Sequence, residues 1–199
     1  MLKLTLKNVS LTCKNKSFNE TIFGDLEFLP GSITGPIALS MSSLINRIGD
    51  VEISLDLKPA LDEEKLDKRL LREIETNPNK NVRYLLGTLL ANGFIDFFVE
   101  NTRTDTDMVL NSLTKEKRLK LLDDLKHFRL TFNGLESIDK GIVTSGGVDV
   151  SEIDPKTMGS KLCDGLYFIG EVLDVDAFTG GFNLQIALST AYSCALSMK

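Results

Sequence analysis

Residues 183–196 form a helix-like stretch that contains no Asp, Glu, Lys or Arg, and this feature constrains the fold more than any other. Its apolar side chains recur on every side of a helical period, at Leu184, Ile186, Ala187, Leu188, Ala191 and Ala195. A helix that is apolar nearly all round is normally buried within a large body. Because the residues from 143 onward are too few to provide that body, we expect a partner segment to cover this helix.

The size and charge of the chain limit how many domains it can form and which partners it can bind. Its 199 residues and 22.0 kDa suffice for one sizeable domain or two small ones with a real core. The net charge of −5 argues against a nucleic-acid surface, which usually carries a basic patch. The most basic stretch, 115–120, is followed at once by Asp123 and Asp124, which is typical of a solvated helix face. We therefore expect no nucleic-acid partner.

The sequence shows no signal for export, a membrane span, a disulfide or a metal site. No apolar run approaches the ~20 residues that cross a bilayer, and residues 1–7 alternate apolar and polar side chains as a strand does. Cys13, Cys163 and Cys194 lie far apart and fit neither a disulfide framework nor a zinc site. His127 is the single histidine, which excludes a histidine-based metal cluster. These features predict a cytoplasmic protein with free thiols, no metal ion and no membrane contact.

The first part of the chain has the period of strands. Its apolar residues change parity, from Leu2, Leu4 and Leu6 to Val9, Leu11 and Cys13. This change predicts a bulge near Lys7-Asn8, because side chains alternate between the faces of a strand. Asn15-Lys16 fits a turn, and residues 25–28 and 51–57 have the alternation of further strands.

Helical periodicity occurs in two further regions. Pro36 suits the first position of a helix, and the apolar residues behind it predict a helix over 36–48. Between 62 and 125 the pattern is mostly helical, with one stripe closed by Asn92-Gly93 and a last helix capped by Thr114. The apolar stripes are Leu66, Leu70 and Ile74; Val82, Leu85, Leu86, Leu89 and Leu90; and Leu119, Leu122 and Leu125.

Strand alternation returns at Phe128, Leu130 and Phe132. The order of strands, helices and a strand predicts an α+β fold in which a small β-barrel or sheet carries a helical insert. Glycine then becomes dense from residue 141 onward, and the acidic residues of this part lie in expected loops.

The stretch 165–185 carries the most specific chemical pattern. Residues 165–170 predict a short buried strand that ends on Gly170, followed by an acidic loop, the Gly180-Gly181 turn and the start of a helix. A helix start offers unpaired backbone N–H groups that suit an anion or an electron-rich ligand edge. Gly-Gly turns before helices are common, so an ordinary strand–turn–helix connection remains an alternative.

Two more glycine-containing segments precede this stretch. They are 28–39 (FLPGSITGPIAL) and 143–148 (VTSGGV), the second continued by 154–161 (DPKTMGSK). Together with 165–185, and in this order, the segments resemble three motifs of the BaiN/YhiN-like family of bacterial NAD(P)/FAD-dependent oxidoreductases. These motifs are a loop ending in Gly-Pro-Ala, a Thr-x-Gly-Gly-Val loop and the C-terminal flavin-binding segment. The resemblance spans nearly the whole chain.

The resemblance implies a domain organisation. In that family an N-terminal Rossmann-like segment carries Gly-x-Gly-x-x-Gly, an insert domain follows, and a C-terminal segment completes the FAD domain. This sequence has no Gly-x-Gly-x-x-Gly after a strand, so it lacks the pyrophosphate and adenosine half of the site. The resemblance implies a β-barrel-like insert domain at 1–60 and 126–142, a helical subdomain at 61–125, and the closing segment of an incomplete Rossmann-like FAD domain at 143–199.

The resemblance also implies which residues face FAD. The residues expected to bind the cofactor are Gly170, Glu171, Asp174, Gly180, Gly181, Phe182, Asn183 and Leu184. Gly170 and Glu171 would lie beside the ribityl–pyrophosphate region, and the backbone around the Gly-Gly turn would donate to the pyrimidine edge of the flavin ring. The loop formed by Thr144, Ser145, Gly146 and Gly147 would approach the flavin face or the substrate. NAD(P)H is the implied electron donor, and no catalytic acid or base is assigned.

Two hypotheses follow for the function. In the first, the chain is the C-terminal portion of an FAD-dependent oxidoreductase and is inactive without an FAD-binding segment or a separate chain that supplies it. Its substrate would be a small molecule of unknown identity. In the second, the chain is a stand-alone, non-enzymatic module that binds a ligand or a protein. Exposed apolar surface and self-association would favour the first hypothesis.

Overall fold

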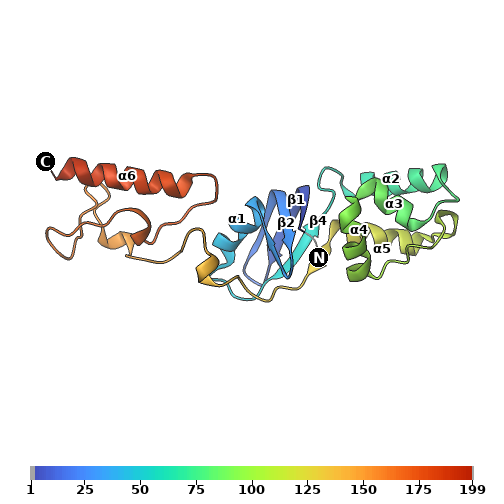
Figure 1. Ribbon diagram of the computed structural model, residues 1–199, viewed down its shortest axis with the longest axis horizontal. Coiled ribbons are helices and arrows are strands. Elements are labelled where there is room, and N and C mark those ends of the chain that lie inside the picture. The colour runs from blue at the N-terminus through green and yellow to red at the C-terminus, as the bar shows by residue number, and fades with distance from the viewer. Residues whose placement is uncertain (1–2, 199) are drawn as a thin grey trace. The chain divides into compact units, whose positions relative to one another are not determined.

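The computed structural model describes residues 3–198, which divide into two compact units (Figure 1). The first, here called the sheet–helix unit, contains the residues up to Met41 together with Ile48–Asn133. The second, the C-terminal unit, contains Ser42–Arg47 and the residues from Gly134 onward. The expected domain boundaries at 60, 125 and 142 stay predictions.

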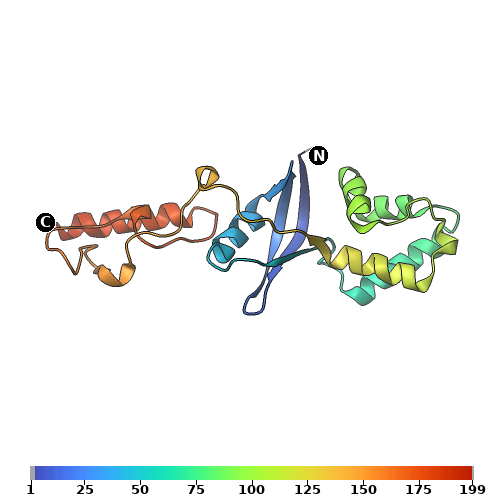
Figure 2. The same cartoon turned by 90° about the horizontal axis from the view of Figure 1, so that it is seen from below.

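The sheet–helix unit is built on a curled, five-stranded antiparallel sheet with the order β3-β2-β1-β4-β5. Figure 2 shows the long hairpin that β1 and β2 form within it. The strands are β1 (Leu4–Lys14), β2 (Asn19–Leu29), β3 (Ser32–Thr34), β4 (Glu52–Asp56) and β5 (Phe128–Leu130). No hydrogen-bonded ladder joins the edge strands β3 and β5 in the described part of the chain, so the barrel-like closure expected from the sequence is not confirmed.

The predicted bulge in β1 is confirmed. The register with β2 shifts between Leu6 and Val9, and Asn8 has a φ of 56°. Asparagine tolerates this left-handed conformation better than most residues, and the Asn8 amide donates to Asp25 Oδ1 at 3.1 Å. The extra residue returns both halves of the strand to one buried face, as the parity change predicts. Leu2 of that pattern lies outside the described residues.

A predicted turn at Asn15-Lys16 and a predicted helix start at Pro36 are also confirmed. Asn15 Oδ1 accepts hydrogen bonds from the amides of Ser17 and Phe18, both at 2.9 Å, and this closes the β1–β2 hairpin. Helix α1 (Pro36–Ile45) begins on the proline, whose missing N–H has no partner to lose at that position.

Four helices follow β4, and their starts are capped as local chemistry requires. They are α2 (Glu63–Thr76), α3 (Val82–Leu89), α4 (Asn92–Thr102) and α5 (Lys115–Lys126), with the short 3-10 turn Leu110–Ser112 before α5. The predicted cap Thr114 is confirmed, since its side chain accepts from the Lys117 amide at 3.3 Å. Asp62 and Asn81 cap α2 and α3 in the same way.

The prediction that Asn92-Gly93 closes a helix was wrong, because these residues begin α4. Leu90 and Ala91 are extended and separate α3 from α4, and helical spacing resumes at once with Phe94 and Phe98, which are both fully buried. The burial of these aromatic rings outweighs the weak helix preference of glycine in the first turn.

Five phenylalanines join the helices to the sheet: Phe28 on β2, Phe94, Phe97 and Phe98 on α4, and Phe128 on β5. The rings of Phe98 and Phe128 stack with centroids 5.5 Å apart, and Phe94 contacts Phe28 at 5.3 Å. Aromatic pairs at such distances add to the stabilisation from burial. This cluster is the core of the sheet–helix unit.

A largely buried ion pair fixes α5 to β4. Lys126 Nζ lies 2.5 Å from Asp56 Oδ2 and also donates to the Leu61 carbonyl at 2.7 Å. The two side chains are only 11% and 20% exposed, so removing either one would leave the other charge poorly solvated. Elsewhere in the core, burial raises the pKa of the Cys13 thiol to about 11, which makes it a poor nucleophile at neutral pH.

The C-terminal unit has little regular structure apart from α6 (Phe182–Ser197). It contains the 3-10 turns Ile138–Lys140, Val150–Glu152 and Gly170–Val172. The buried strand predicted at 165–170 was wrong: Tyr167 forms a single bridge to Gly159, and Leu166 and Ile169 are each 43% exposed. Two backbone hydrogen bonds join 166–168 to 158–160, but this contact is limited to one bridge and the described residues leave the apolar side chains of 165–170 without a full cover.

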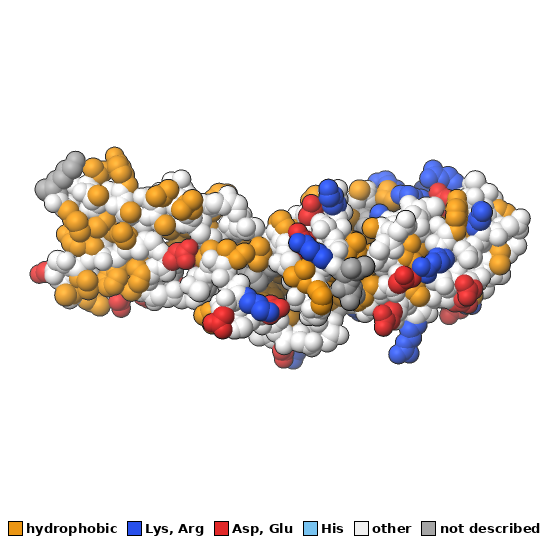
Figure 3. Space-filling view, in the orientation of Figure 1, with side chains coloured by type: hydrophobic (Ala, Val, Ile, Leu, Met, Phe, Trp, Pro, Cys, Tyr) orange, Lys and Arg blue, Asp and Glu red, His pale blue; other side chains and the backbone are white. Residues whose placement is uncertain are grey.

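The sequence correctly predicts α6 as a helix. Leu184, Leu188 and Tyr192 are 66%, 60% and 68% exposed, and Cys194 is the buried residue of the helix. Figure 3 shows hydrophobic side chains gathered on the surface of this part of the chain. The described residues therefore leave the helix largely uncovered, in agreement with the expectation that the residues from 143 onward are too few to bury it; the partner segment stays a prediction. Among the described residues, no helix has the length and hydropathy of a membrane span, and no group of side chains forms a metal site.

Replacing Phe94 by alanine should destabilise the sheet–helix unit by about 3–5 kcal/mol, because the substitution leaves a cavity at the centre of the aromatic cluster. Urea denaturation followed by circular dichroism measures the change. The matched control is Phe23→Ala, which removes a ring that is 61% exposed and should change stability by less than ~0.5 kcal/mol. Equal losses in the two variants would contradict the assignment of the core.

Candidate functional site

The loop at 144–148 lies against the backbone of 172–174. The Val148 amide donates to the Val172 carbonyl at 2.8 Å, and the Asp174 amide donates to the Val148 carbonyl at 2.9 Å. Val148 and Leu173 thereby form a parallel bridge. Gly147 makes this approach possible, because a Cβ at its position would lie 2.4 Å from the Val172 carbonyl oxygen. Only glycine permits such close backbone contact without a shift.

Asp174 anchors this loop from the side. Its Oδ1 accepts a hydrogen bond from the Gly146 amide at 3.1 Å and from Arg47 Nη2 at 2.7 Å. Arg47 also lies 3.4 Å from Ser145 Oγ. The carboxylate is about one-third exposed and the guanidinium is more exposed, so the ion pair mainly fixes geometry and contributes modestly to stability.

Three polar residues that the sequence analysis missed, Ser43, Asn46 and Arg47, lie at the end of α1 or just after it. They form hydrogen bonds with the 144–148 loop and with the acidic loop at 174–176. Asn46 Nδ2 donates to Ser145 Oγ at 2.9 Å, and Ser43 Oγ donates to Asp176 Oδ2 at 2.5 Å. Ser43, Asn46 and Arg47 are spaced three and four residues apart, which places them on one helical face. The spacing of these polar residues at and just beyond the end of α1 is the signal that could have identified them.

The start of α6 is open. Gly180 and Gly181 have φ values of 121° and 94°, and Gly181, at the cap position, provides no side chain to cap the helix. A Cβ at Gly181 would meet no atom within 4 Å. The first amides of the helix therefore point to a region that no side chain of the cap residue fills. Phe182 and Leu184, in the first turn, are 61% and 66% exposed.

Asn183 has a structural role that the sequence analysis did not assign to its side chain. Its Nδ2 donates to the Ala177 carbonyl and its Oδ1 accepts from the Ala177 amide, both at 2.8 Å. This reciprocal pair ties the acidic loop to the first turn of α6. One N–H of the side-chain amide is used in this way, and the backbone N–H of Asn183, in the first turn of α6, is the donor that we assign to a ligand.

Gly170 and Glu171 lie in the 3-10 turn that precedes Asp174. Gly170 has a φ of 67°, and its amide donates to Thr190 Oγ1 on α6 at 3.0 Å. Glu171 is exposed, as is Thr144 at the beginning of the 144–148 loop. The structure therefore brings Ser145, Gly146 and Gly147 together with Asp174, and joins Gly170 to α6. The part of these residues in binding a cofactor stays a prediction.

The chain belongs to the family described as HI0933-like protein Rossmann domain, whose family model matches residues 7–197. Over 179 residues it is 34% identical to the ribosomal RNA dihydrouridine synthase of Haemophilus influenzae, an alignment that covers 90% of this chain and 43% of that protein. Over 178 residues it is 33% identical to the ribosomal RNA dihydrouridine synthase of Escherichia coli, with 89% of this chain and 43% of that protein covered.

A third relative is named for a different activity. The chain is 27% identical over 143 residues to the 3-dehydro-bile acid delta(4,6)-reductase of Clostridium scindens, which covers 72% of this chain and 35% of that protein. The chain thus spans about 43% of the length of the first two curated relatives.

The substitution Gly147→Ala should separate the 144–148 loop from residues 172–174, because the new methyl group would occupy the position of the Val172 carbonyl. Amide hydrogen exchange at Val148 and Asp174 should accelerate, since both amides donate in this contact. The control is Gly146→Ala, which also has a positive φ but has open space at the Cβ position. Unchanged exchange at both amides in the Gly147 variant would refute the role of this glycine.

Proposed function

We propose that the chain supplies the insert domain and the closing segment of an FAD-dependent oxidoreductase of the BaiN/YhiN type. The dinucleotide-binding half of the flavin site would come from another segment or another chain. The observation that carries this proposal is α6, a helix without charged side chains whose apolar surface is exposed. Family membership and the reductase name of the Clostridium scindens relative support the same assignment.

The exposure of the apolar side chains of α6 to water is energetically unfavourable. Burying one large apolar side chain contributes about 1.5–3 kcal/mol, and Leu184, Leu188 and Tyr192 are all largely exposed. Exposed Ile169 and Val172 lie in and beside the 3-10 turn that contacts α6 and extend this apolar surface. A Rossmann-like sheet would cover such a helix with its own apolar face. Without that cover, the chain should self-associate.

The residues present fit one side of a flavin. The uncapped start of α6 offers backbone N–H groups, and the open space at Gly181 lets a flat ring approach them. These donors would stabilise negative charge at the pyrimidine edge, together with the positive end of the helix dipole. Bound FAD would supply the hydride-transfer chemistry, with NAD(P)H as the electron donor.

The 144–148 loop would form the substrate side of the site. Gly147 and Asp174 fix the loop against the turn that precedes the Gly-Gly segment, and Arg47 holds Asp174. In this arrangement Ser145 and Thr144 are the polar side chains of the loop. We assign the loop a positioning role and assign no proton transfer to it.

The names of the relatives suggest a class of substrate. Formation of dihydrouridine and a delta(4,6)-reductase activity both mean saturation of a carbon–carbon double bond. In uracil and in a 3-oxo steroid diene, that bond is conjugated to a carbonyl group. We therefore propose a conjugated carbon–carbon double bond as the reducible group, with RNA as the favoured substrate. This proposal departs from the expectations of a small-molecule substrate and no nucleic-acid partner, the second of which rests on the net charge of −5 and on the solvated face expected at 115–120.

The alternative of a stand-alone binding module has one specific observation in its favour. The sheet–helix unit has its own aromatic core and capped helices, so it has the features of a self-sufficient fold. The exposed apolar surface of α6 argues against the module for the chain as a whole. A compact monomer that does not bind a hydrophobic dye would favour the module.

Flavin titration tests the proposal in two steps. Added to this chain alone, FAD should show no saturable quenching of its fluorescence at micromolar concentration, because half of the site is missing. A chimera should bind FAD and turn yellow when it joins this chain to the part of the Escherichia coli relative that the chain does not match. Tight, stoichiometric binding by the chain alone would contradict the claim of a half site, and a colourless, folded chimera would contradict the flavin assignment.

Within the chimera, Asn183→Ala should weaken FAD binding by about tenfold, roughly 1.4 kcal/mol, because the loop at Ala177 would no longer be tied to α6. The matched control is Gln185→Ala, which removes an exposed amide that contacts only Ser189 among the described residues. An equal effect of the two substitutions would count against the role of the α6 start.

A further inference from the structure

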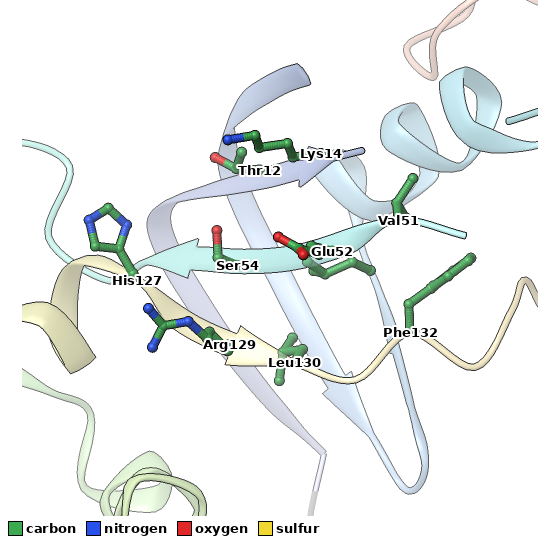
Figure 4. A pocket seen from close by; sticks show the side chains of 10 residues that line it. Thr12, Lys14, Val51, Glu52, Ser54, His127, Arg129, Leu130 and Phe132 are labelled. Carbon is green, nitrogen blue, oxygen red and sulfur yellow. The ribbon is translucent and has the colours of Figure 1, made fainter. Parts of the chain in front are cut away.

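A groove of about 730 Å³ lies in the sheet–helix unit, and none of the residues that line it belongs to the proposed flavin site. Figure 4 shows its lining on β1, β4 and β5 and on the segments that flank β4 and β5. It is lined by Thr12, Lys14, Val51, Glu52, Ile53, Ser54, His127, Arg129, Leu130 and Phe132. A smaller hollow shares His127 and Arg129 with it and adds Lys120 and Asn101.

Strand register places the polar lining in rows. Thr12 pairs with Ser54, and Ser54 pairs with Arg129, so two hydroxyls and a guanidinium form one row across three strands. Lys14 pairs with Glu52 in the next row on the same face. Directly opposite residues on a sheet lie about 5 Å apart, so a chain-like ligand could contact consecutive rows.

The charge of the groove differs in sign from that of the whole protein. The lining of the groove contains Lys14 and Arg129 against Glu52, an excess of one positive charge in a chain of net charge −5. Lys120 of the adjoining hollow is paired with Asp124, and Arg129 itself contacts Asp123 just outside the lining. A local basic groove attracts a polyanion even where the overall charge is negative.

The arginine is available for a new partner. Both of its terminal nitrogens lie 3.5 Å from Asp123 Oδ2, which is the outer limit of a hydrogen bond, and both side chains are largely exposed. Such a contact contributes little and exchanges at little cost. A phosphate would give the guanidinium a bidentate partner instead.

We propose that this groove binds the backbone of single-stranded RNA. Arg129 and Lys14 would contact phosphates, Thr12 and Ser54 would donate to phosphate or ribose oxygens, and the half-buried ring of Phe132 would stack on a base. The choice of RNA over other polyanions rests on the proposed function, in which RNA is the substrate.

Fluorescence anisotropy of a fluorescein-labelled, single-stranded RNA of roughly 12 nucleotides tests the groove on the full chain. The double variant Lys14→Gln, Arg129→Gln should weaken binding by at least tenfold at low salt. The slope of log K against log salt should fall by about 1.4, since each lost phosphate contact on a single strand removes ~0.7. Glu52→Gln should tighten binding, because it removes a negative charge beside the same phosphates.

The matched control is Lys68→Gln, Arg83→Gln. It removes the same two charges from exposed ion pairs elsewhere in the sheet–helix unit and should change RNA affinity by less than twofold. Circular dichroism of every variant establishes that the fold is kept. Absence of RNA binding, or equal binding by the groove variant and the control, would overturn the proposal. Displacement of RNA by heparin at equal charge concentration would overturn the assignment to RNA.

Failure of the groove and failure of the proposed function are distinguishable. RNA binding needs no flavin in this assay, and flavin binding by the chimera needs no RNA. A yellow chimera with RNA affinity unaffected by the groove variant refutes the groove alone. A colourless chimera with RNA affinity that depends on Lys14 and Arg129 refutes the flavin assignment and keeps the groove.

Discussion

The burial of α6 is the constraint on which the account of this protein depends. The helix has the composition of a core helix, yet within the chain Cys194 is its buried residue. The sheet–helix unit, in contrast, has a core of its own, formed by the aromatic cluster, and a largely buried ion pair between Lys126 and Asp56. The chain therefore combines one unit with a complete core and one whose apolar helix requires a cover. This contrast and the family membership are the two observations that support the proposal that the chain is a portion of a flavoprotein.

Local chemistry made much of the fold predictable. The parity change in β1 gave the bulge at Asn8, and Thr114 and Pro36 gave two helix starts, because each depends on neighbours in the sequence. The start of α4 was not predictable in this way, since tertiary burial of Phe94 and Phe98 overrides the weak helix preference of Asn92-Gly93. The strand expected at 165–170 failed for a related reason: a strand depends on a partner, and the partner is not encoded in the local pattern.

In the candidate site, too, some residues were predicted from the sequence and others were found only in the structure. The glycines were predicted from the family resemblance, and the structure gives their physical reason, since a side chain would clash at Gly147 and Gly181 has a positive φ. Arg47, which holds Asp174, was missed because the two residues are far apart in sequence and only the fold brings them together. The groove at Arg129 was missed as well, since strand register, rather than sequence spacing, assembles its rows.

Hydrogen exchange of the backbone amides of this chain, compared between α6 and α3, tests the central claim most directly. Exchange protection reflects how well a segment is held by tertiary contacts. If α6 lacks its cover, its amides should exchange much faster than those of α3, whose Leu85 and Leu86 are fully buried, although α6 is the longer helix. Equal protection of the two helices in monomeric chain would contradict the account, because α6 would then belong to a unit that is complete by itself.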